Sequence, residues 1–308
     1  MRIAIIGAGH VGSTAAYALM LRALFREIVL IDTDLNLAAA EAADLSDANA
    51  LARPTSIWAG TYQDAAPARI ALITAGTATH GSETRISVAA RSAEIVGRCV
   101  TELMASGFAG IVVVAANPVD LMTSVVLRQS GLPPARVIGT GTLLDTSRLQ
   151  QELGAILGVA PAAIDALVIG EHGDSEVIAF SLLRVGGLTL ESFAAPHAAP
   201  DKQYLAKVLR EAAYKIIEGK GYTSFAIATS VVRICEAIVR DERAVLPVST
   251  WLSGQFGISD ICLSLPCVLG SEGRMVVLNP ALADDEVTQL QASAAAIQDA
   301  LSALAQSF

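Results

Sequence analysis

A glycine-rich segment follows the apolar run Ile3–Ile6 near the start of the chain and precedes a stretch of helical character. It reads Gly7-Ala8-Gly9-His10-Val11-Gly12, which is the pattern Gly-x-Gly-x-x-Gly. In this context the first glycine permits a tight turn, the second lets a ligand approach the backbone, and the third lets helix and strand pack closely. The free N–H groups at the helix start favour a phosphate. We therefore expect Gly7, Gly9, His10, Val11 and Gly12 to contact a dinucleotide.

Asp32 narrows the choice of dinucleotide. It lies 20 residues after Gly12, at the end of the second apolar run, Ile28–Ile31. A carboxylate at this place accepts hydrogen bonds from ribose hydroxyls and repels a 2′-phosphate. The sequence therefore predicts NAD rather than NADP as the cofactor.

The first half of the chain alternates short apolar runs with helical stretches. The runs are continuous and rich in Val and Ile, which is typical of strands buried on both faces of a parallel sheet. They are Ile3–Ile6, Ile28–Ile31, Ile70–Thr74 and Ile111–Ala115, with helices such as Val11–Leu24 and Ile86–Ser106 between them. This order predicts an α/β protein whose N-terminal domain is a Rossmann-type, doubly wound parallel sheet.

The second half is less regular and predicts a C-terminal α+β catalytic domain. Helices are expected over Thr142–Leu157, Lys202–Glu218, Ser224–Arg240 and Asp284–Ala305, with a break at Gly219-Lys220-Gly221. Strands are expected at Ala166–Ile169, Val245–Thr250, Ile261–Leu265 and Met275–Val277, and a surface loop at Ala194–Pro200. We place the domains at residues 1–140 and 141–308.

Composition excludes several classes of function. Apolar residues make up 53% of the 308 residues and charged residues 17%, which argues against disorder, and the net charge of -9 argues against nucleic acid as a partner. No secretory signal is recognised, and the apolar stretch Gly107–Val119 is too short to span a membrane. The spacing of Cys99, Cys235, Cys262 and Cys267 does not suit a metal. We expect buried free thiols, no metal and a cytoplasmic location.

Four further clusters carry polar side chains suited to chemistry. They are Glu83-Thr84-Arg85, Asn117-Pro118-Val119-Asp120, Asp145-Thr146-Ser147-Arg148 and Gly170-Glu171-His172-Gly173-Asp174-Ser175. Reduction of a 2-oxo acid requires a proton donor at the carbonyl oxygen, a cation that polarises it, and a planar cation that holds the carboxylate. These clusters contain candidates for each requirement.

Each candidate suits one of these tasks. His172 suits the acid/base role because its ordinary pKa lies near neutrality, and Asp145 could orient its imidazole. Arg148 lies three residues from Asp145, so both project from one helix face and the guanidinium could hold a carboxylate. Arg85 follows a glycine-bearing segment that could close as a lid and bring a second cation. Taken singly, a histidine on a turn is more often structural and an Asp–Arg pair is usually a surface pair.

The ordered combination resembles the L-lactate/malate dehydrogenase family, on its lactate dehydrogenase side, nearly end to end. The shared segments are the glycine motif with Asp32, Ala75-Gly76 through Glu83-Thr84-Arg85, Asn117–Asp120, Gly139–Asp145, Gly170–Ser175 and Glu218–Ser224. The resemblance implies that His172 is the acid/base, Asp145 its partner, Arg148 the carboxylate ligand and Arg85 the lid arginine.

The resemblance also assigns the surroundings of the site. Ala75 and Gly76 would contact the cofactor, Asn117 would hydrogen-bond near substrate and nicotinamide, Thr223 would line the substrate pocket, and Ile227 would back the nicotinamide ring. A small 2-oxo or 2-hydroxy acid would be the substrate. A homodimer or homotetramer is implied as well.

The lid departs from the family pattern. Counting back from Arg85, the position that sets substrate choice is Thr79, where similar lactate enzymes carry Gln and malate enzymes carry Arg. A second substrate carboxylate would require a cation, and only His80 could supply one. Malate is therefore disfavoured, and because Thr is shorter than Gln, a substrate bulkier or more polar than pyruvate is the hypothesis, with ordinary lactate dehydrogenase the alternative.

A second departure concerns regulation. Bacterial lactate enzymes activated by fructose 1,6-bisphosphate use a basic residue and a histidine between subunits. Those positions fall on Gln150 and Asp165 here. Since an acidic residue repels a phosphate, the sequence predicts no activation by this sugar phosphate.

Three other classes fit less well. A short-chain dehydrogenase would require Tyr-x-x-x-Lys, but Tyr204 and Lys207 have the wrong spacing. A metal- and NAD-dependent glycosidase would require a cysteine near Asn117, which follows Ala115-Ala116. A non-catalytic NAD-binding sensor would tolerate the loss of His172, Arg85 or Arg148, and turnover distinguishes it from an enzyme.

Overall fold

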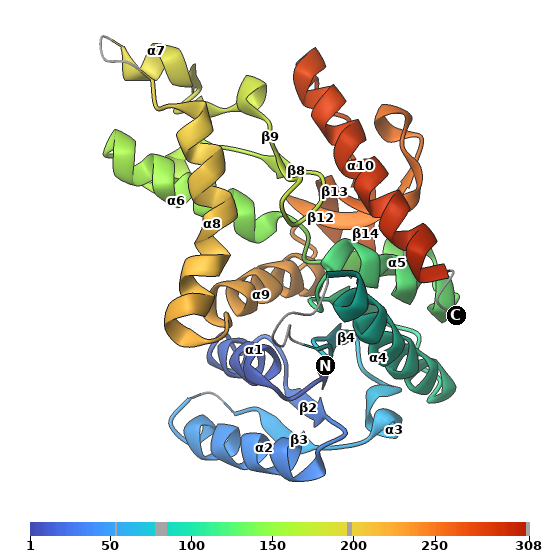
Figure 1. Ribbon diagram of the computed structural model, residues 1–308. Helices are drawn as coiled ribbons and strands as arrows, with labels where there is room; N and C mark the ends of the chain where they lie inside the picture. Colours follow the sequence, from blue (N-terminus) through green and yellow to red (C-terminus); the bar gives the residue numbers. More distant parts are fainter. Residues whose placement is uncertain (53, 78–84, 196–198, 306–308) are drawn as a thin grey trace.

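A nine-stranded sheet forms the centre of the molecule in the computed structural model, which describes residues 1–52, 54–77, 85–195 and 199–305, with residues 85–87 and 305 described by backbone alone (Figure 1). Six of its strands are parallel and lie in the order β3-β2-β1-β4-β5-β6. They are β1 (Arg2–Ile6), β2 (Glu27–Ile31), β3 (Ser56–Ala59), β4 (Ile70–Ile73), β5 (Ile111–Val114) and β6 (Val137–Gly139). This order confirms the predicted doubly wound sheet.

Both faces of this sheet are covered, which explains why the strands are apolar without alternation. In β1, Ile3 and Ile5 face a core shared with α1 (His10–Leu21), α2 (Leu35–Asn49) and α9 (Phe225–Val239). Ala4 and Ile6 face a second core shared with α4 (Arg85–Ala105), α5 (Val119–Ser130) and α10 (Asp284–Ala305). Since successive side chains of a strand point to opposite faces, each strand must supply apolar residues to both cores.

The sheet continues into the second half of the chain. There β12 (Ala244–Ser253), β13 (Ser259–Gly270) and β14 (Gly273–Val277) form an antiparallel unit that joins the parallel strands where Ser249 pairs with Gly139. The three strand-like runs expected there are thus confirmed, although each extends further than expected. The division at residue 140 stays a prediction.

A smaller layer lies to one side of the large sheet. It holds the helices α6 (Leu143–Leu157), α7 (Leu190–Ala194) and α8 (Lys202–Lys220), the sheet of β7 (Ile164–Asp165), β10 (Arg184–Val185) and β11 (Leu188–Thr189), and the pair β8 (Val168–Ile169) with β9 (Val177–Ile178). A third core, which includes Leu149, Leu153 and Leu205, holds this layer together. The mixture of helices and short antiparallel strands confirms the expected α+β character.

Several sequence-based boundaries are wrong in detail. The helix expected to end at Leu24 ends at Leu21 as α1, and Ala194, expected in a loop, is the last residue of α7. The helix expected to end at Glu218 continues as α8 through Gly219 and ends at Lys220, and its C-cap is Gly221, whose φ of +87° suits only glycine well. The strand expected over Ala166–Ile169 is confined to Val168–Ile169, because it pairs with only the two residues of β9.

The structure also tests the expected burial of the cysteines and the expected lack of a membrane-spanning segment. Cys235, Cys262 and Cys267 are buried free thiols as expected, whereas Cys99 is only partly buried. Among the helices in the described part of the chain, none is long and apolar enough to cross a membrane.

Candidate active site

The glycine turn is built as its pattern predicts. Gly7 has a φ of +107°, and a Cβ there would lie 2.7 Å from the Ala75 backbone nitrogen. A Cβ on Gly12 would collide with the carbonyl oxygen of Gly7. Over Gly9, in contrast, the space is open to 4 Å. The two outer glycines are therefore required by close packing, while the middle one leaves room for a ligand.

The start of α1 fits a diphosphate. Gly9 is the N-cap and supplies no side-chain hydrogen bond, and the first helical turn, which begins with His10 and Val11, carries no acidic residue. The backbone N–H groups of this turn and the positive end of the helix dipole thus face the open space over Gly9. The residues present fit the pyrophosphate of NAD.

Asp32, at the end of β2, already holds this turn in place. Its Oδ2 accepts a hydrogen bond from the Ala8 backbone nitrogen at 2.7 Å, and its Oδ1 accepts one from the Asp34 backbone nitrogen at 2.9 Å. The carboxylate is partly exposed. Its remaining lone pairs could therefore accept from ribose hydroxyls, in addition to a structural role that the sequence did not reveal.

The other expected cofactor contacts lie at the same edge of the sheet. Ala75 and Gly76 follow β4, and the exposed Asn117 follows β5. Because the parallel strands end together, these residues lie along the edge that carries Gly7 and Asp32. In doubly wound folds ligands bind at this carboxyl edge.

His172, Asp145 and Arg148 come together from two elements. The Nδ1 atom of His172 lies 2.6 Å from Oδ2 of Asp145, and Nη1 of Arg148 donates to Oδ1 of the same carboxylate at 3.0 Å. Asp145 and Arg148 project from the first turns of α6, and His172 follows β8. The Asp145 side chain is only 3% exposed, whereas those of His172 and Arg148 are 23% and 16% exposed. The carboxylate is thus buried behind two partly accessible cations.

These contacts fix the charges of the cluster. Burial by itself lowers the pKa of His172, but the Asp145 carboxylate beside it outweighs burial and raises that pKa to about 9. Burial likewise favours a raised pKa for Asp145, yet the His172 and Arg148 charges hold that pKa below its usual range. At neutral pH the cluster therefore holds an imidazolium, a guanidinium and one carboxylate. It carries a net positive charge and can donate a proton.

Three contacts that the sequence did not assign hold the His172 loop. The buried Asp120 accepts from the backbone nitrogen of His172 at 2.8 Å. Ser293 of α10 accepts from the Glu171 backbone nitrogen at 2.8 Å. Gly170, with a φ of +88°, pairs with Ser264 of β13. Asp120 was singled out within Asn117–Asp120, but nothing in the sequence placed it under His172.

Glu176 is a further carboxyl group that the sequence analysis missed. Its Oε1 is buried and has no hydrogen-bond partner among the described residues. Burial, together with the nearby Asp145 carboxylate, raises the pKa of Glu176 to about 8, against the opposing charges of His172, Arg148 and Arg210. A neutral carboxyl group therefore lies beside the charged cluster at neutral pH.

The other residues expected at the site either follow α8 in the chain or lie, wholly or by their side chains, outside the residues that the structure describes. Thr223 is in the loop between α8 and α9, and Ile227 lies in the first turn of α9; both are partly buried. Arg85 begins α4, but its side chain is not described. Thr79 and His80 lie outside the described residues. The lid hypothesis therefore stays a prediction.

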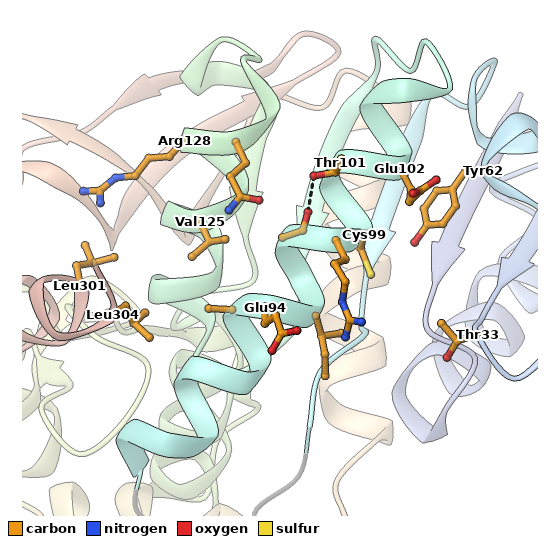
Figure 2. A pocket seen from close by; sticks show the side chains of 15 residues that line it. Thr33, Tyr62, Glu94, Cys99, Thr101, Glu102, Val125, Arg128, Leu301 and Leu304 are labelled. Carbon is orange, nitrogen blue, oxygen red and sulfur yellow. Dashed lines mark hydrogen bonds between the residues drawn. The ribbon is translucent and has the colours of Figure 1, made fainter. Parts of the chain in front are cut away.

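A cleft of about 830 Å³ runs along α4 (Figure 2). Thr33, next to Asp32, and Tyr62 lie on one side of the helix, and Leu301 and Leu304 of α10 lie on the other. Among its described lining residues, none belongs to the His172 cluster. Cys99 lines this cleft, but burial raises the pKa of its thiol, which keeps it protonated. The cleft thus approaches the site only at its Asp32 end.

No group of three or more His, Cys, Asp or Glu side chains in the described part of the chain is arranged to hold a metal ion. The positive charges of His172 and Arg148 suit the binding of a small anion. The positive cluster can hold a carboxylate through Arg148 and supply a proton from His172 to an oxygen on the same molecule.

Comparison with known proteins agrees with this geometry. The family model of the lactate/malate dehydrogenase NAD-binding domain matches residues 1–139, and that of the lactate/malate dehydrogenase alpha/beta C-terminal domain matches residues 142–307. The L-lactate dehydrogenase of Thermus aquaticus is 41% identical over 308 residues, covering 99% of each chain. That of Priestia megaterium is 40% identical over 300 residues, covering 96% of this chain and 94% of that protein. The crystal structure of the minor L-lactate dehydrogenase from Enterococcus mundtii in its ligands-bound form superposes with a TM-score of 0.95, at 37% identity and covering 98% of this chain and 97% of that chain.

Proposed function

Because the chain belongs to the lactate/malate dehydrogenase family and is an NAD-dependent dehydrogenase of 2-hydroxy acids, we propose that it interconverts L-lactate and pyruvate. The names of its relatives support this pair. The expectation of a bulkier or more polar substrate gains no support from them, and it depends on Thr79 alone. The glycosidase, short-chain and sensor alternatives are set aside with the family assignment.

The His172–Asp145–Arg148 arrangement carries the proposal. Bound NADH supplies the hydride that reaches C2 of the 2-oxo acid. His172, charged at neutral pH, donates its proton to the oxygen on C2 and is left as the neutral imidazole. Asp145 fixes the tautomer and orientation of that ring through the 2.6 Å contact at Nδ1, so the proton is delivered from Nε2.

Arg148 would hold the carboxylate of the substrate. One of its nitrogens is bound to Asp145, which fixes the plane of the guanidinium and leaves its other donors for the ligand. A substrate bound through two parallel hydrogen bonds has one orientation of its C2 carbonyl relative to His172. Arg85 would polarise that carbonyl from the lid, and Asn117 and Thr223 would complete the pocket.

Oxidation of NADH by the purified protein with a panel of 2-oxo acids tests the proposal. We expect pyruvate to have the highest kcat/KM among pyruvate, oxaloacetate, phenylpyruvate and branched or hydroxylated homologues. A longer 2-oxo acid with a higher kcat/KM than pyruvate would overturn the proposed substrate and support the Thr79 hypothesis. Turnover of none of them, with NADH bound, would overturn the activity.

We further propose that the protein forms a homodimer or homotetramer and is located in the cytoplasm. Exposed apolar side chains lie on α1 (Tyr17, Leu21) and near the end of α8 (Ile216, Ile217), which favours a homodimer or homotetramer. A cytoplasmic location agrees with the free thiols. Size-exclusion chromatography with light scattering tests the oligomeric state, and a monomer at micromolar concentration would contradict it.

A further inference from the structure

His10 and Tyr222 stack face to face across the boundary between the cofactor turn and the second half of the chain. Their ring centroids lie 3.8 Å apart, and the ring planes differ by 11°. His10 is the first residue of α1, whereas Tyr222 lies in the loop of residues 221–224 that joins α8 to α9. Figure 1 shows α1 beside the end of α8 and the start of α9. The stack thus ties the dinucleotide turn to this loop.

The loop is held together by a second aromatic contact. The Lys220 ammonium lies 4.4 Å from the centroid of the Tyr222 ring and 3.9 Å from that of Phe225. It also donates to Oγ of Ser224 at 3.5 Å. The Tyr222 ring thus contacts both the His10 imidazole and the Lys220 ammonium. Cation–π attraction therefore makes the segment from Lys220 to Phe225 one unit with Tyr222 at its centre.

Few other hydrogen bonds among the described residues hold residues 221–223 themselves. The buried residues of α8 are Leu205 and Leu209, near its beginning, and residues 214–220 are all exposed. Ser224, the N-cap of α9, makes no capping hydrogen bond with its side chain. The packing of α9 against α1 in their shared core fixes the end of the loop from Ser224 onward, and the stack of Tyr222 on His10 is the contact that reaches residues 221–223 themselves.

Thr223, the expected lining residue of the substrate pocket, is the neighbour of Tyr222 in this loop. We infer that His10 and Tyr222 are a positioning pair that fixes Thr223, and with it the substrate pocket, relative to the cofactor turn. This inference rests on the proposed function for the identity of the substrate. Neither ring belongs to the His172–Asp145–Arg148 cluster, so the pair is expected to act on binding rather than on the chemical step.

Steady-state kinetics of four variants test the inference: Tyr222→Ala, Tyr222→Phe, His10→Ala and the double alanine variant. Tyr222→Ala is expected to raise KM for pyruvate about fivefold, which corresponds to the loss of one aromatic pair. It is expected to change kcat less than twofold. Tyr222→Phe keeps the aromatic ring and is expected to have the KM of the original protein. If the pair acts as a unit, His10→Ala and the double variant raise KM by the same factor as Tyr222→Ala. Tyr204→Ala, which removes an exposed aromatic ring near the beginning of α8, is the matched control and should leave both constants unchanged.

Additive effects in the double variant, or a fall in kcat with KM unchanged, would overturn the inference. Hydrogen exchange of residues 221–228 gives a readout that is independent of turnover. Faster exchange in Tyr222→Ala than in Tyr222→Phe supports the pair even if no 2-oxo acid is reduced, in which case only the proposed function fails. Equal exchange in the two variants contradicts the pair whatever the activity.

Discussion

The backbone nitrogen of His172 donates a 2.8 Å hydrogen bond to Oδ2 of Asp120, which is 1% exposed. The histidine is therefore held at both ends by buried carboxyl groups, Asp120 at its backbone and Asp145 at its ring. Replacement of Asp120 by Ala leaves the His172 N–H without this acceptor. We expect the free energy of unfolding to fall by about 1–3 kcal/mol, measured by urea denaturation. The activity should fall with it because the ring loses its fixed place.

Asp120→Asn is the matched control. Its side chain keeps an oxygen that can accept the same hydrogen bond, so a smaller loss of stability than in Asp120→Ala is expected. Equal losses in the two variants would show that the hydrogen bond to His172 does not stabilise the loop.

The pH dependence of catalysis is set by His172. Since its pKa is raised from the ordinary 6.5 to about 9, the imidazolium that donates the proton is present below pH 9 and lost above it. Reduction of pyruvate should therefore be flat through neutrality and decline with a midpoint near pH 9, and lactate oxidation should rise over the same range. The raised pKa also contributes stability that is complete below pH 6.5 and lost as the pH rises through about 9.

Asp145→Asn tests the cause of that midpoint. Without the carboxylate, burial lowers the pKa of His172 against only the weaker influence of Asp120 and Glu176, so the midpoint of the pH profile should move down by more than one unit. The rate of reduction should fall about 100-fold or more at neutral pH. A midpoint unchanged in Asp145→Asn would contradict the assignment.

Glu176 should add a second pH effect, on substrate binding. Its carboxyl group is neutral at pH 7 because its pKa is raised to about 8, mainly by burial and then by Asp145. As the pH passes 8, a negative charge forms beside His172 and Arg148, and KM for the pyruvate anion should rise several-fold. Glu176→Gln stays neutral and should remove this rise in KM, leaving only the decline in the rate of reduction near pH 9. Glu211→Gln, on the exposed face of α8, should behave as the original protein.

Local patterns determined how much of this fold could be predicted. The runs Ile3–Ile6 and Ile111–Ala115 predicted β1 and β5 because strands buried on both faces leave a continuous apolar record. The short, partly exposed strand β3 (Ser56–Ala59) has no such record, and it forms by pairing with β2 along the sheet edge. The joining of β12 to β6 likewise depends on a pairing between Ser249 and Gly139, 110 residues apart, that no local pattern encodes.

The candidate site divides in the same way. Asp145 and Arg148 could be paired from sequence because helical spacing fixes their distance, and His172 could be added by its chemistry. The sequence could not place Asp120 beneath His172 or Tyr222 on His10, since both contacts join distant segments whose approach is set by the whole fold. Glu176 lacks a local signal, because its raised pKa arises from burial and charges on other elements.

Asp32 is expected to affect cofactor affinity in two ways. Asp32→Ala removes the acceptor of the Ala8 N–H, found at 2.7 Å, together with the expected acceptor of the ribose hydroxyls. The dissociation constant for NADH, measured by fluorescence titration, should therefore rise at least tenfold, and preference over NADPH should fall. Asp32→Asn keeps an oxygen toward Ala8 but loses the charge, so it should retain more NADH affinity while discriminating less against NADPH. Equal NADH affinity in the two variants would show that the contact to Ala8 is dispensable.

Fructose 1,6-bisphosphate is expected to leave the activity unchanged. Gln150 and Asp165 line a second cleft of about 510 Å³, in which Gln150 donates to the Ile164 carbonyl oxygen at 2.9 Å and Asp165 is exposed. Among the described residues of this cleft the one cation is Arg233, and it is paired with Glu242 at 2.5 Å. A sugar bisphosphate would thus meet one neutralised cation and one exposed carboxylate, which repels it. The kinetic constants should be the same with and without 5 mM fructose 1,6-bisphosphate. This concentration is on the order of a thousand times a micromolar binding constant. The double variant Gln150→Arg with Asp165→His replaces repulsion by attraction and should lower KM in its presence; stimulation of the original protein would contradict the prediction.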